Sequence, residues 1–455
     1  MVQTFEPTFE SLRAHVLPEW FDDAKFGIFV HWTMSCIPAF APQVGSLPEI
    51  FRDHPNDPLK FSPYAEWYQN TARFPESEAA TYHREKYGDA PYESFREPFE
   101  AALNAWDPGP LVDLIVDSGA RYVVYVTKHH DGFALWPTDV PNPHAPGWNS
   151  RRDMVAVLAA AVRERGLRFG VYYSGGLDWT FNRDPIASVR EMFESVPRTA
   201  EYRQYADAHC RELIARYRPS VLWNDIAYPP GPELPALMAH YYAAVPDGVV
   251  NDRWSQPGED GALTPSHYDF RTPEYAQYSE IRKRKWEATR GIGHSYGYAA
   301  NEPLSNVISP AELIHSFVDG VSKNGNLLLN IGPRADGSVQ PEHEVPLRAL
   351  GAWLRANGEA IFGTRPWDNA EGIAHSAGTE FPVRFTTNGD RLFATILGPL
   401  SVGEFAIDGL GGREAAGLRV LATGDMVPAT VANGRLSASF PELLPAEAHA
   451  FQILG

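Results

Sequence analysis

Short, nearly continuous apolar runs alternate with amphipathic helical segments over residues 1–362 of the chain. Residues 122–126, 168–174 and 326–332 are three such runs, rich in β-branched and aromatic side chains. Strands that are apolar on both faces are typical of a parallel sheet covered by helices on each side. Roughly seven or eight such units predict a (β/α)8-like TIM barrel over residues 1–362.

Two helix starts within this region can be predicted from the sequence. Ser150 is a candidate N-cap for a helix over residues 150–166, where Gly166 ends the apolar periodicity. The segment Ser309-Pro310-Ala311-Glu312 has the pattern of a capping box with Pro at the first helical position.

The pattern changes after residue 363, where short alternating runs separated by turn residues replace the helical periodicity. Asn388 and Gly389 stand between two such runs and predict a tight hairpin turn. We therefore expect a C-terminal antiparallel β-sandwich over residues 363–455, with a packing or stabilising role.

Charge and cysteine content exclude several classes of function. The net charge of −18 argues against nucleic acid and anionic membranes as partners. The two cysteines, Cys36 and Cys210, predict neither a disulfide framework nor a zinc site. The N-terminal residues lack the features of a signal peptide, so a cytoplasmic protein is expected. Whether the chain forms a homo-oligomer stays open.

In a barrel of this kind the reactive side chains stand at the C-terminal ends of the strands. A carboxylate, Asp225, directly follows the apolar run 221–223, and a helix N-cap is the plain alternative for it. Applied to every expected strand, the rule selects His31, His129, His130, Tyr172, Asp225, Arg253 and Glu274.

Three functions fit this set of side chains. Two carboxylates facing each other across a cleft suit glycoside hydrolysis, with His and Arg side chains holding sugar hydroxyls. A metal-dependent barrel hydrolase is the main alternative, with Zn²⁺ or Mn²⁺ held by the strand-end His and Asp residues. Against it, neighbouring residues of a strand point to opposite faces, so His129 and His130 face one ion only if the strand ends before them. A catalytically silent sugar-binding protein is the third.

A set of motifs spread over residues 20 to 340 resembles one enzyme family. In chain order they are WFDDAKFGIFVHW, EWY, TKHHDGFALW, FGVYYSGGLDW, LWNDIAYP, NDRW, DFRTPEY, KWEATRGIGHSYGY and VSKNGNLLLNIGPRADG. Together they are similar to the family 29 glycoside hydrolases, the retaining α-L-fucosidases. The resemblance implies a catalytic barrel followed by a β-sandwich, exo-acting cleavage of terminal α-L-fucosyl groups from oligosaccharides or glycosides, and no cofactor or metal.

The resemblance also implies roles for individual residues. Asp225 in LWND matches the family's nucleophile and Glu274 in TPEY its general acid/base, and Glu287 is the alternative acid. The positions that match fucose-holding residues are His31, Glu66, Trp67, His129, His130, Tyr172 and Arg253. Trp223 and Tyr296 are expected on the apolar side of the site, where the C5 methyl group of the sugar must lie. Lys128 and Asp131 are expected to be structural, with Asp131 capping the turn.

Overall fold

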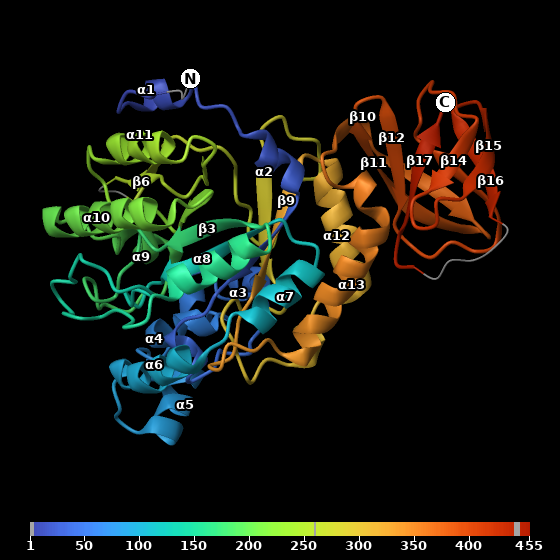
Figure 1. Cartoon of the computed structure of the whole chain (residues 1–455). Helices are drawn as coiled ribbons and strands as arrows, with labels where there is room; N and C mark the ends of the chain where they lie inside the picture. The colour runs from blue at the N-terminus through green and yellow to red at the C-terminus, as the bar shows by residue number, and fades with distance from the viewer. Residues whose placement is uncertain (1–3, 259–260, 441–445) are drawn as a thin grey trace.

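The computed structural model describes residues 4–258, 261–440 and 446–455. Its first sheet contains seven parallel strands in the order β5-β4-β3-β2-β1-β9-β8 (Figure 1). These strands are β1 (Phe26–Val30), β2 (Tyr122–Lys128), β3 (Arg168–Tyr173), β4 (Val221–Asn224), β5 (Val249–Val250), β8 (Trp286–Gly291) and β9 (Gly325–Ile331).

A short extended segment links the two edges of this sheet. Phe270 forms a parallel bridge with Asn251, which directly follows β5, and Glu274 forms one with Thr289 of β8. Residues 270–274 therefore occupy the eighth strand position, between β5 and β8. The predicted (β/α)8-like barrel is confirmed, with an eighth position that is bridged at single residues instead of forming a regular strand.

Side chains at alternate strand positions fill the interior of the ring, as the two-residue period of a strand requires. Along β2, Tyr122, Val124 and Val126 belong to one buried cluster, whereas Val123 and Tyr125 belong to a second one that includes the surrounding helices. The inner cluster also contains Phe29, Tyr172, Val221, Trp223, Val249, Phe270 and Leu328. The barrel is therefore a packed core, and open space is confined to its ends.

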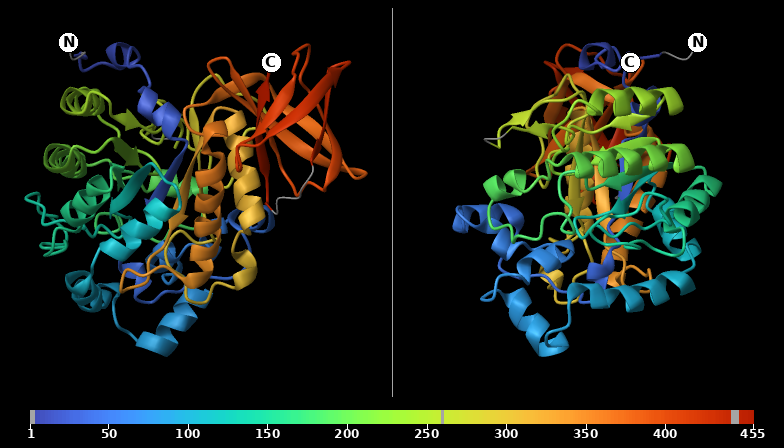
Figure 2. Two further views of the ribbon diagram at one scale, coloured as in Figure 1. Left: turned by 45° about the vertical axis from the view of Figure 1, so that its right-hand side comes forward. Right: turned by 90° about the vertical axis from the view of Figure 1, so that its left-hand side faces the viewer.

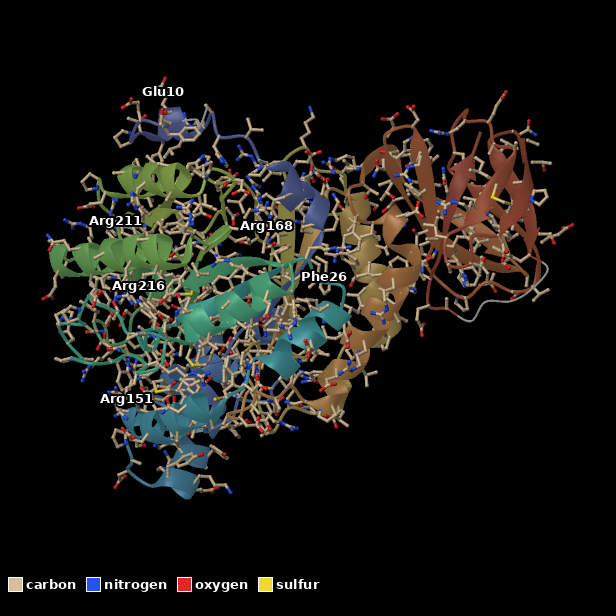
Figure 3. All side chains as sticks on the ribbon, in the orientation of Figure 1. Glu10, Phe26, Arg151, Arg168, Arg211 and Arg216 are labelled. Atoms are coloured by element: carbon tan, nitrogen blue, oxygen red, sulfur yellow. The ribbon has the colours of Figure 1, made fainter. Side chains whose placement is uncertain are left out.

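Helices cover the outside of the ring (Figure 2). They are α7 (Gly109–Asp117), α8 (Met154–Glu164), α10 (Ala200–Tyr217), α11 (Leu234–Ala244), α12 (Pro310–Ser322) and α13 (Pro341–Asn357). Arg211 and Arg216 lie on the outer side of α10, whereas Phe26 at the start of β1 is buried (Figure 3). No helix in the described ranges is long and apolar enough to span a membrane.

The helix starts show how local sequence sets these boundaries. Ser309 and Glu312 form the predicted capping box at the start of α12. The prediction for α8 was wrong by three residues, because its N-cap is Asp153 and not Ser150. The Asp153 carboxylate accepts a hydrogen bond from the Ala156 amide at 2.8 Å, while the Ser150 hydroxyl donates to the Arg152 carbonyl.

Smaller elements surround the ends of the barrel. The remaining α-helices are α1 (Phe9–Leu12), α2 (Glu19–Ala24), α3 (Leu47–Asp53), α4 (Tyr68–Thr71), α5 (Glu78–Tyr87), α6 (Arg96–Ala105) and α9 (Val189–Glu194). The 3-10 helices are η1 (Met34–Cys36), η2 (Pro58–Phe61), η3 (Ala65–Trp67), η4 (Tyr92–Phe95), η5 (Leu304–Asn306) and η6 (Gly358–Ala360). A small hairpin pairs β6 (Gln256–Pro257) with β7 (Leu263–Thr264).

The C-terminal part is all antiparallel β structure, as predicted, and its strands close into one barrel in the order β10-β11-β12-β17-β14-β15-β16-β13. The predicted turn joins β11 to β12, with Gly389 at a φ of 57°. Helix α12 packs against β10 and β11, and the Trp353 indole of α13 donates to the Ala448 carbonyl at 2.8 Å. The strands are β10 (Arg365–Ser376), β11 (Thr379–Asn388), β12 (Arg391–Ile396), β13 (Gly403–Asp408), β14 (Gly417–Val420), β15 (Met426–Ala432), β16 (Arg435–Phe440) and β17 (His449–Leu454).

Candidate active site

One cavity of about 300 Å³ lies at the C-terminal end of the parallel barrel. It contains all but one of the side chains that the sequence selected for the site. These are His31, Glu66, Trp67, His129, Tyr172, Trp223, Asp225, Arg253, Glu274 and Tyr296. They come from eight separate segments of the chain, so only the closed barrel brings them together.

The two predicted carboxylates meet at a single guanidinium group. Arg253 Nη1 lies 2.8 Å from Asp225 Oδ1, and Arg253 Nη2 lies 3.0 Å from Glu274 Oε2. Asp225 follows β4, and Glu274 ends the segment that closes the barrel. One guanidinium therefore bridges the two acids, although they are 49 positions apart in the chain.

Asp225 is surrounded by hydrogen-bond donors. Tyr172 Oη donates to Asp225 Oδ2 at 2.7 Å, and the Ile226 amide donates to Oδ1 at 2.8 Å. Burial alone would raise the pKa of Asp225, but the charge of Arg253 and the hydrogen bond from Tyr172 outweigh it and hold the pKa below its ordinary value. Asp225 is therefore ionised at neutral pH, the state that a nucleophile needs.

Glu274 lies closer to solvent than Asp225. Its side chain is 24% exposed, against 11% for Asp225. Tyr64 Oη donates to Glu274 Oε1 at 2.6 Å, and Arg253 holds the other oxygen. This carboxyl group is thus oriented from two sides and is the more exposed of the two.

Strained backbone follows each of the two carboxylates. Ile226 has a φ of 64° and Tyr275 a φ of 47°, so both residues adopt the left-handed region. This conformation is a genuine outlier for a β-branched residue such as Ile; it costs about 1–3 kcal/mol per residue, and such residues cluster at active sites. The chain accepts this cost at the two points where the carboxylates are aimed into the cavity.

The cavity histidines are neutral. Burial lowers the pKa of His31 to about 4 and the pKa of His129 well below its ordinary value. His31 Nδ1 lies 2.6 Å from Asn330 Oδ1, and the His129 ring stacks on Tyr172 with its Nδ1 unpartnered among the described residues. A neutral imidazole has one donor and one acceptor nitrogen, which suits a hydroxyl group.

Glu66 is a buried acid in the same wall. Burial raises the pKa of Glu66 to about 8, and its Oε2 accepts from the Gly297 amide at 2.7 Å. At neutral pH the carboxyl is mostly protonated, so it too both donates and accepts.

Aromatic rings form the apolar side of the cavity. Trp223 stacks on Tyr172 with ring centroids 5.5 Å apart and contacts Phe29 at 5.1 Å. The Arg253 guanidinium lies over the Trp223 ring, 4.7 Å from the ring centroid. Tyr296 contacts His31, with centroids 5.0 Å apart. The cavity thus combines flat apolar surfaces with converging polar groups, as sites for small ligands do.

Some predicted residues lie elsewhere. His130 does not line the cavity: its Nδ1 lies 2.6 Å from Ser174 Oγ, and its Nε2 is 3.8 Å from Asp225. Glu287, the alternative acid, is completely buried and hydrogen-bonded to Tyr122 inside the barrel, away from the cavity. It is therefore in no position to protonate a leaving group.

The two flanking charged residues hold the fold, as expected. Lys128 pairs with Asp178 at 2.8 Å in the interior. Asp131 accepts from the Phe133 amide at 3.0 Å and so caps the turn after the paired histidines.

The arrangement that a metal-dependent hydrolase would need is present only in part. His129, His130 and Asp225 each offer one donor atom, and these atoms lie within 4.8 Å of one another. Strand β2 ends at Lys128, so the adjacent histidines are free to turn to one side. However, Arg253 and Tyr172 already hold the Asp225 oxygens, and the guanidinium charge opposes a cation at this position.

Sequence reasoning missed two groups of cavity residues. Tyr64, which holds Glu274, directly follows the Pro-rich residues 38–63, which give no strand end for the strand-end rule to select. Its position two residues before Glu66 was the available sequence feature. The outer rim is apolar and comes from α3 and α9, and neither helix was predicted. Its residues are Leu47, Phe51, Val189, Met192 and Phe193.

Known proteins with related sequences and structures share this architecture. The family model for alpha-L-fucosidase matches residues 1–359. A mouse tissue alpha-L-fucosidase is 31% identical over 414 residues, which cover 86% of this chain and 80% of that protein. A human plasma alpha-L-fucosidase is 32% identical over 384 residues, covering 80% of this chain and 74% of that protein.

Solved structures agree over nearly the whole chain. The Thermotoga maritima alpha-fucosidase is 38% identical with a TM-score of 0.86, and the match covers 99% of this chain and 100% of that one. The same enzyme in complex with fucose gives a TM-score of 0.85 at the same identity and coverage. With the family model matching most of its length, and with a barrel and a β domain like those of these enzymes, this chain belongs to the alpha-L-fucosidase family.

Proposed function

We propose that this protein is an exo-acting α-L-fucosidase that hydrolyses terminal α-L-fucosyl linkages with retention of configuration. The observation that carries the proposal is the Arg253 guanidinium, which contacts both Asp225 and Glu274 in one cavity. Retaining glycosidases need their two carboxyl groups about 5–5.5 Å apart, whereas inverting ones need room for a water molecule between the acid and the sugar. Two acids held by one arginine fork favour the closer arrangement.

In the first step Asp225 attacks the anomeric carbon. The bond from that carbon to the aglycone oxygen breaks, and the departing oxygen takes the proton of Glu274, so a covalent fucosyl ester of Asp225 forms. The low pKa of Asp225 keeps the attacking oxygen ionised. As the ester forms, Asp225 loses its charge, and Arg253 remains paired with the newly ionised Glu274.

In the second step Glu274 acts as the base. It removes a proton from a water molecule, the water oxygen attacks the anomeric carbon, and the ester bond to Asp225 breaks. Glu274 is again protonated and Asp225 again ionised. Tyr64 donates to Glu274 and so keeps its carboxyl group aimed at the same point through both steps.

The walls of the cavity suit one fucose ring. Neutral His31 and His129 and the protonated Glu66 offer donors and acceptors to ring hydroxyls. Trp223 and Tyr296 supply the apolar surface for the C5 methyl group. A volume of about 300 Å³ is at the lower end of ligand pockets, which fits a single terminal sugar and hence exo action.

The deciding experiment is turnover of an aryl α-L-fucoside by the purified chain, followed by proton NMR of the first fucose released. We expect hydrolysis in which the α anomer appears before mutarotation. Release of the β anomer first would show inversion and contradict the covalent step. Fucose binding without turnover would show a sugar-binding protein.

A further inference from the structure

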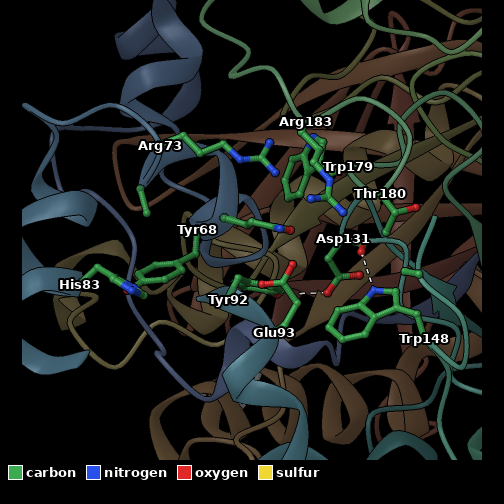
Figure 4. Close-up of a pocket in the computed structure, with 13 residues that line it drawn as sticks. Tyr68, Arg73, His83, Tyr92, Glu93, Asp131, Trp148, Trp179, Thr180 and Arg183 are labelled. Carbon is green, nitrogen blue, oxygen red and sulfur yellow. Dashed lines mark hydrogen bonds between the residues drawn. The ribbon is translucent and has the colours of Figure 1, made fainter. Parts of the chain in front are cut away.

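A second cavity of about 340 Å³ lies beside the active-site cavity and shares none of its lining residues. It is lined by Tyr68, Gln69, Ala72, Arg73, His83, Tyr92, Glu93, Asp131, Ala145, Trp148, Trp179, Thr180 and Arg183. Residues from α4, α5, η4 and three loops therefore form it (Figure 4).

The two cavities are built by the same stretches of chain. Trp67 lines the active site and Tyr68, the next residue, lines the second cavity. Between them stands the Trp179 ring, whose centroid is 5.5 Å from that of His130 and 5.7 Å from that of Trp67. The second cavity is thus separated from the active site by the contacting rings of Trp67 and Trp179.

Three charged side chains enter the second cavity without partners. Arg73, Arg183 and Glu93 make no side-chain hydrogen bond or ion pair with any residue that the structure describes, and Figure 4 shows the two arginines on one side of the space and Glu93 on the other. Arg183 and Glu93 are exposed, whereas Arg73 is half-buried. Arg73 lies over the Trp179 ring at 5.6 Å, and its buried Nη1 is unpartnered within the described ranges. Buried polar atoms are nearly always hydrogen-bonded, so such a group in a cavity wall points to a missing partner.

Two further buried polar atoms in this wall are unpartnered as far as the described residues go. They are Gln69 Oε1, an acceptor, and Trp179 Nε1, a donor. Both atoms lie beneath the cavity surface, so the donors and acceptors open to a ligand come from the two arginines and Glu93.

The aromatic rings of the second cavity are fixed by the fold. Tyr68 Oη is hydrogen-bonded to His83 at 2.8 Å, Tyr92 Oη donates to Asp131 at 3.1 Å, and Trp148 Nε1 donates to the Asp131 carbonyl at 2.9 Å. Their polar ends are occupied, so the parts of these rings that reach the cavity are apolar. Rigid rings of this kind lose little conformational entropy when a ligand packs on them.

The mixture of charges selects the class of ligand. A phosphate or sulfate would meet the Glu93 carboxylate, and a metal ion would meet two guanidinium groups. The hydroxyl groups of a neutral ligand accept hydrogen bonds from the two arginines and donate hydrogen bonds to Glu93. The C–H face of such a ligand packs on Trp148. We propose that the second cavity binds a neutral pyranose, at a site separate from the catalytic one; only the choice of sugars as probes rests on the proposed function.

The test measures binding directly. The full chain is titrated with L-fucose to count its sites, and the fucose-saturated chain is then titrated with D-galactose and with N-acetyl-D-glucosamine, using saturation-transfer NMR and calorimetry. We expect either a second fucose site per chain or binding of at least one of the other two sugars in the presence of fucose, with one site per chain. Because no turnover is measured, a chain that fails to hydrolyse fucosides would still give a valid result here.

Two variants localise the binding. Arg73→Met keeps the aliphatic stem and removes the charge, and Glu93→Gln changes an exposed residue with little effect on folding. Each should weaken the second sugar by about tenfold, as expected for loss of a hydrogen bond to a charged group. Arg348→Met, on α13 and paired with Glu344 and Asp117, is the matched control and should leave binding unchanged.

Three results would overturn the proposal. The first is that L-fucose fills only one site per chain and neither of the other two sugars binds to the fucose-saturated chain. The second is that both variants bind as the unsubstituted chain does, which would place the sugar elsewhere. The third is that sulfate binds in an Arg73-dependent way while the sugars do not, which would make this an anion site.

Discussion

The two domains differ in what they bury. The β domain has an almost purely apolar core, and His449 is its only fully buried ionisable residue among those described. The parallel barrel buries many ionisable side chains, among them Lys25, His31, Glu66, Lys128, His129, His130, Asp178, Asp225, Lys285 and Glu287. Burying such groups costs several kcal/mol unless they are paired, so their accumulation in one domain needs a reason.

Within the barrel the buried charges fall into two kinds. Lys128 and Asp178 form a closed pair at 2.8 Å, and the Asp22 carboxylate is shared by Lys285 at 2.7 Å, Arg365 at 2.9 Å and Lys25 at 3.3 Å, and these contacts hold the fold. Around the cavity two carboxylates converge on Arg253, and there His129 keeps an unpartnered nitrogen. Buried ionisable groups thus mark function where they converge and remain incompletely satisfied.

The largest expected effect is the fall in activity when the Asp225 carboxylate is removed, which tests whether the charges around Arg253 mark the active site. Asp225→Ala should lower kcat/KM by about 10⁴-fold or more, because no covalent intermediate can form. Added azide should restore turnover and yield β-fucosyl azide, since it enters from the face that the carboxylate has left. Asp139→Ala, which changes a side chain that is 90% exposed, is the matched control. Ordinary hydrolysis by the Asp225 variant would contradict the assignment.

The loss of Glu274 should be next in size and should depend on the substrate. Glu274→Ala removes proton transfer to the leaving oxygen, a contribution of about 10²–10⁴-fold. Fucosides with poor leaving groups should lose this factor, and aryl fucosides with good leaving groups should lose far less in the first step. Steady-state kinetics on both kinds of substrate measure the difference. An equal loss on both would remove Glu274 from the acid role.

Features that depend on nearby residues could be predicted from the sequence. Apolar runs and helix periodicity depend on local residues, so the barrel strands and the capping box of α12 could be predicted. Asp225 was found because it directly follows a strand. The strand-end rule also selected Glu274, although its strand position is formed by isolated bridges whose partners are distant in the chain.

Features that depend on distant contacts could not be found in this way. Tyr64 reaches Glu274 across 210 positions, and nothing near either residue encodes the contact. His130 and His129 are equivalent in the sequence, and only the hydrogen bond of His130 with Ser174 separates their positions. The closure of the β domain into one barrel likewise depends on pairing between strands far apart, such as β10 with β13.

In the β domain, by contrast, a core substitution should cause a large loss of stability without a loss of activity. Phe405 is buried in the β domain and contacts Phe440 and Phe451, with centroids 4.8 and 5.9 Å away. Phe405→Ala should destabilise this domain by about 3–5 kcal/mol. Because the cavity is formed by the barrel alone, kcat/KM at low temperature should be unchanged. Denaturant unfolding and kinetics on one preparation measure both, with the exposed Val402→Ala as control. A matching loss of activity would show that the β domain supports the site.

A smaller, pH-dependent effect is expected at Glu287. Burial raises the pKa of Glu287 from 4.5 to about 8. Below pH 4.5 the carboxyl is protonated in both the folded and the unfolded state. Between pH 4.5 and 8 the Glu287 carboxyl ionises only in the unfolded chain. The free energy of unfolding therefore falls as pH rises, by up to about 1.4 kcal/mol per pH unit.

Glu287→Gln should remove that loss, because the amide cannot ionise and its oxygen still accepts from Tyr122. The variant should therefore gain stability relative to the unsubstituted protein as pH rises from 5 to 8, by on the order of 1 kcal/mol per pH unit. Glu404→Gln, at an exposed position of β13, should show no such trend. A difference that is the same at every pH would mean that Glu287 is ionised in the folded barrel.

The smallest expected effect belongs to metal removal. Treatment with EDTA should leave kcat/KM unchanged, because the Asp225 oxygens are held by Arg253 at 2.8 Å and Tyr172 at 2.7 Å. A divalent cation bound to Asp225 would have to displace or lie beside the guanidinium, against its charge. His129 and His130 would then serve as hydrogen-bonding groups and not as ligands. If EDTA abolished activity and added Zn²⁺ or Mn²⁺ restored it, this assignment would be wrong. The cluster of charged groups around Arg253 would then be a metal site.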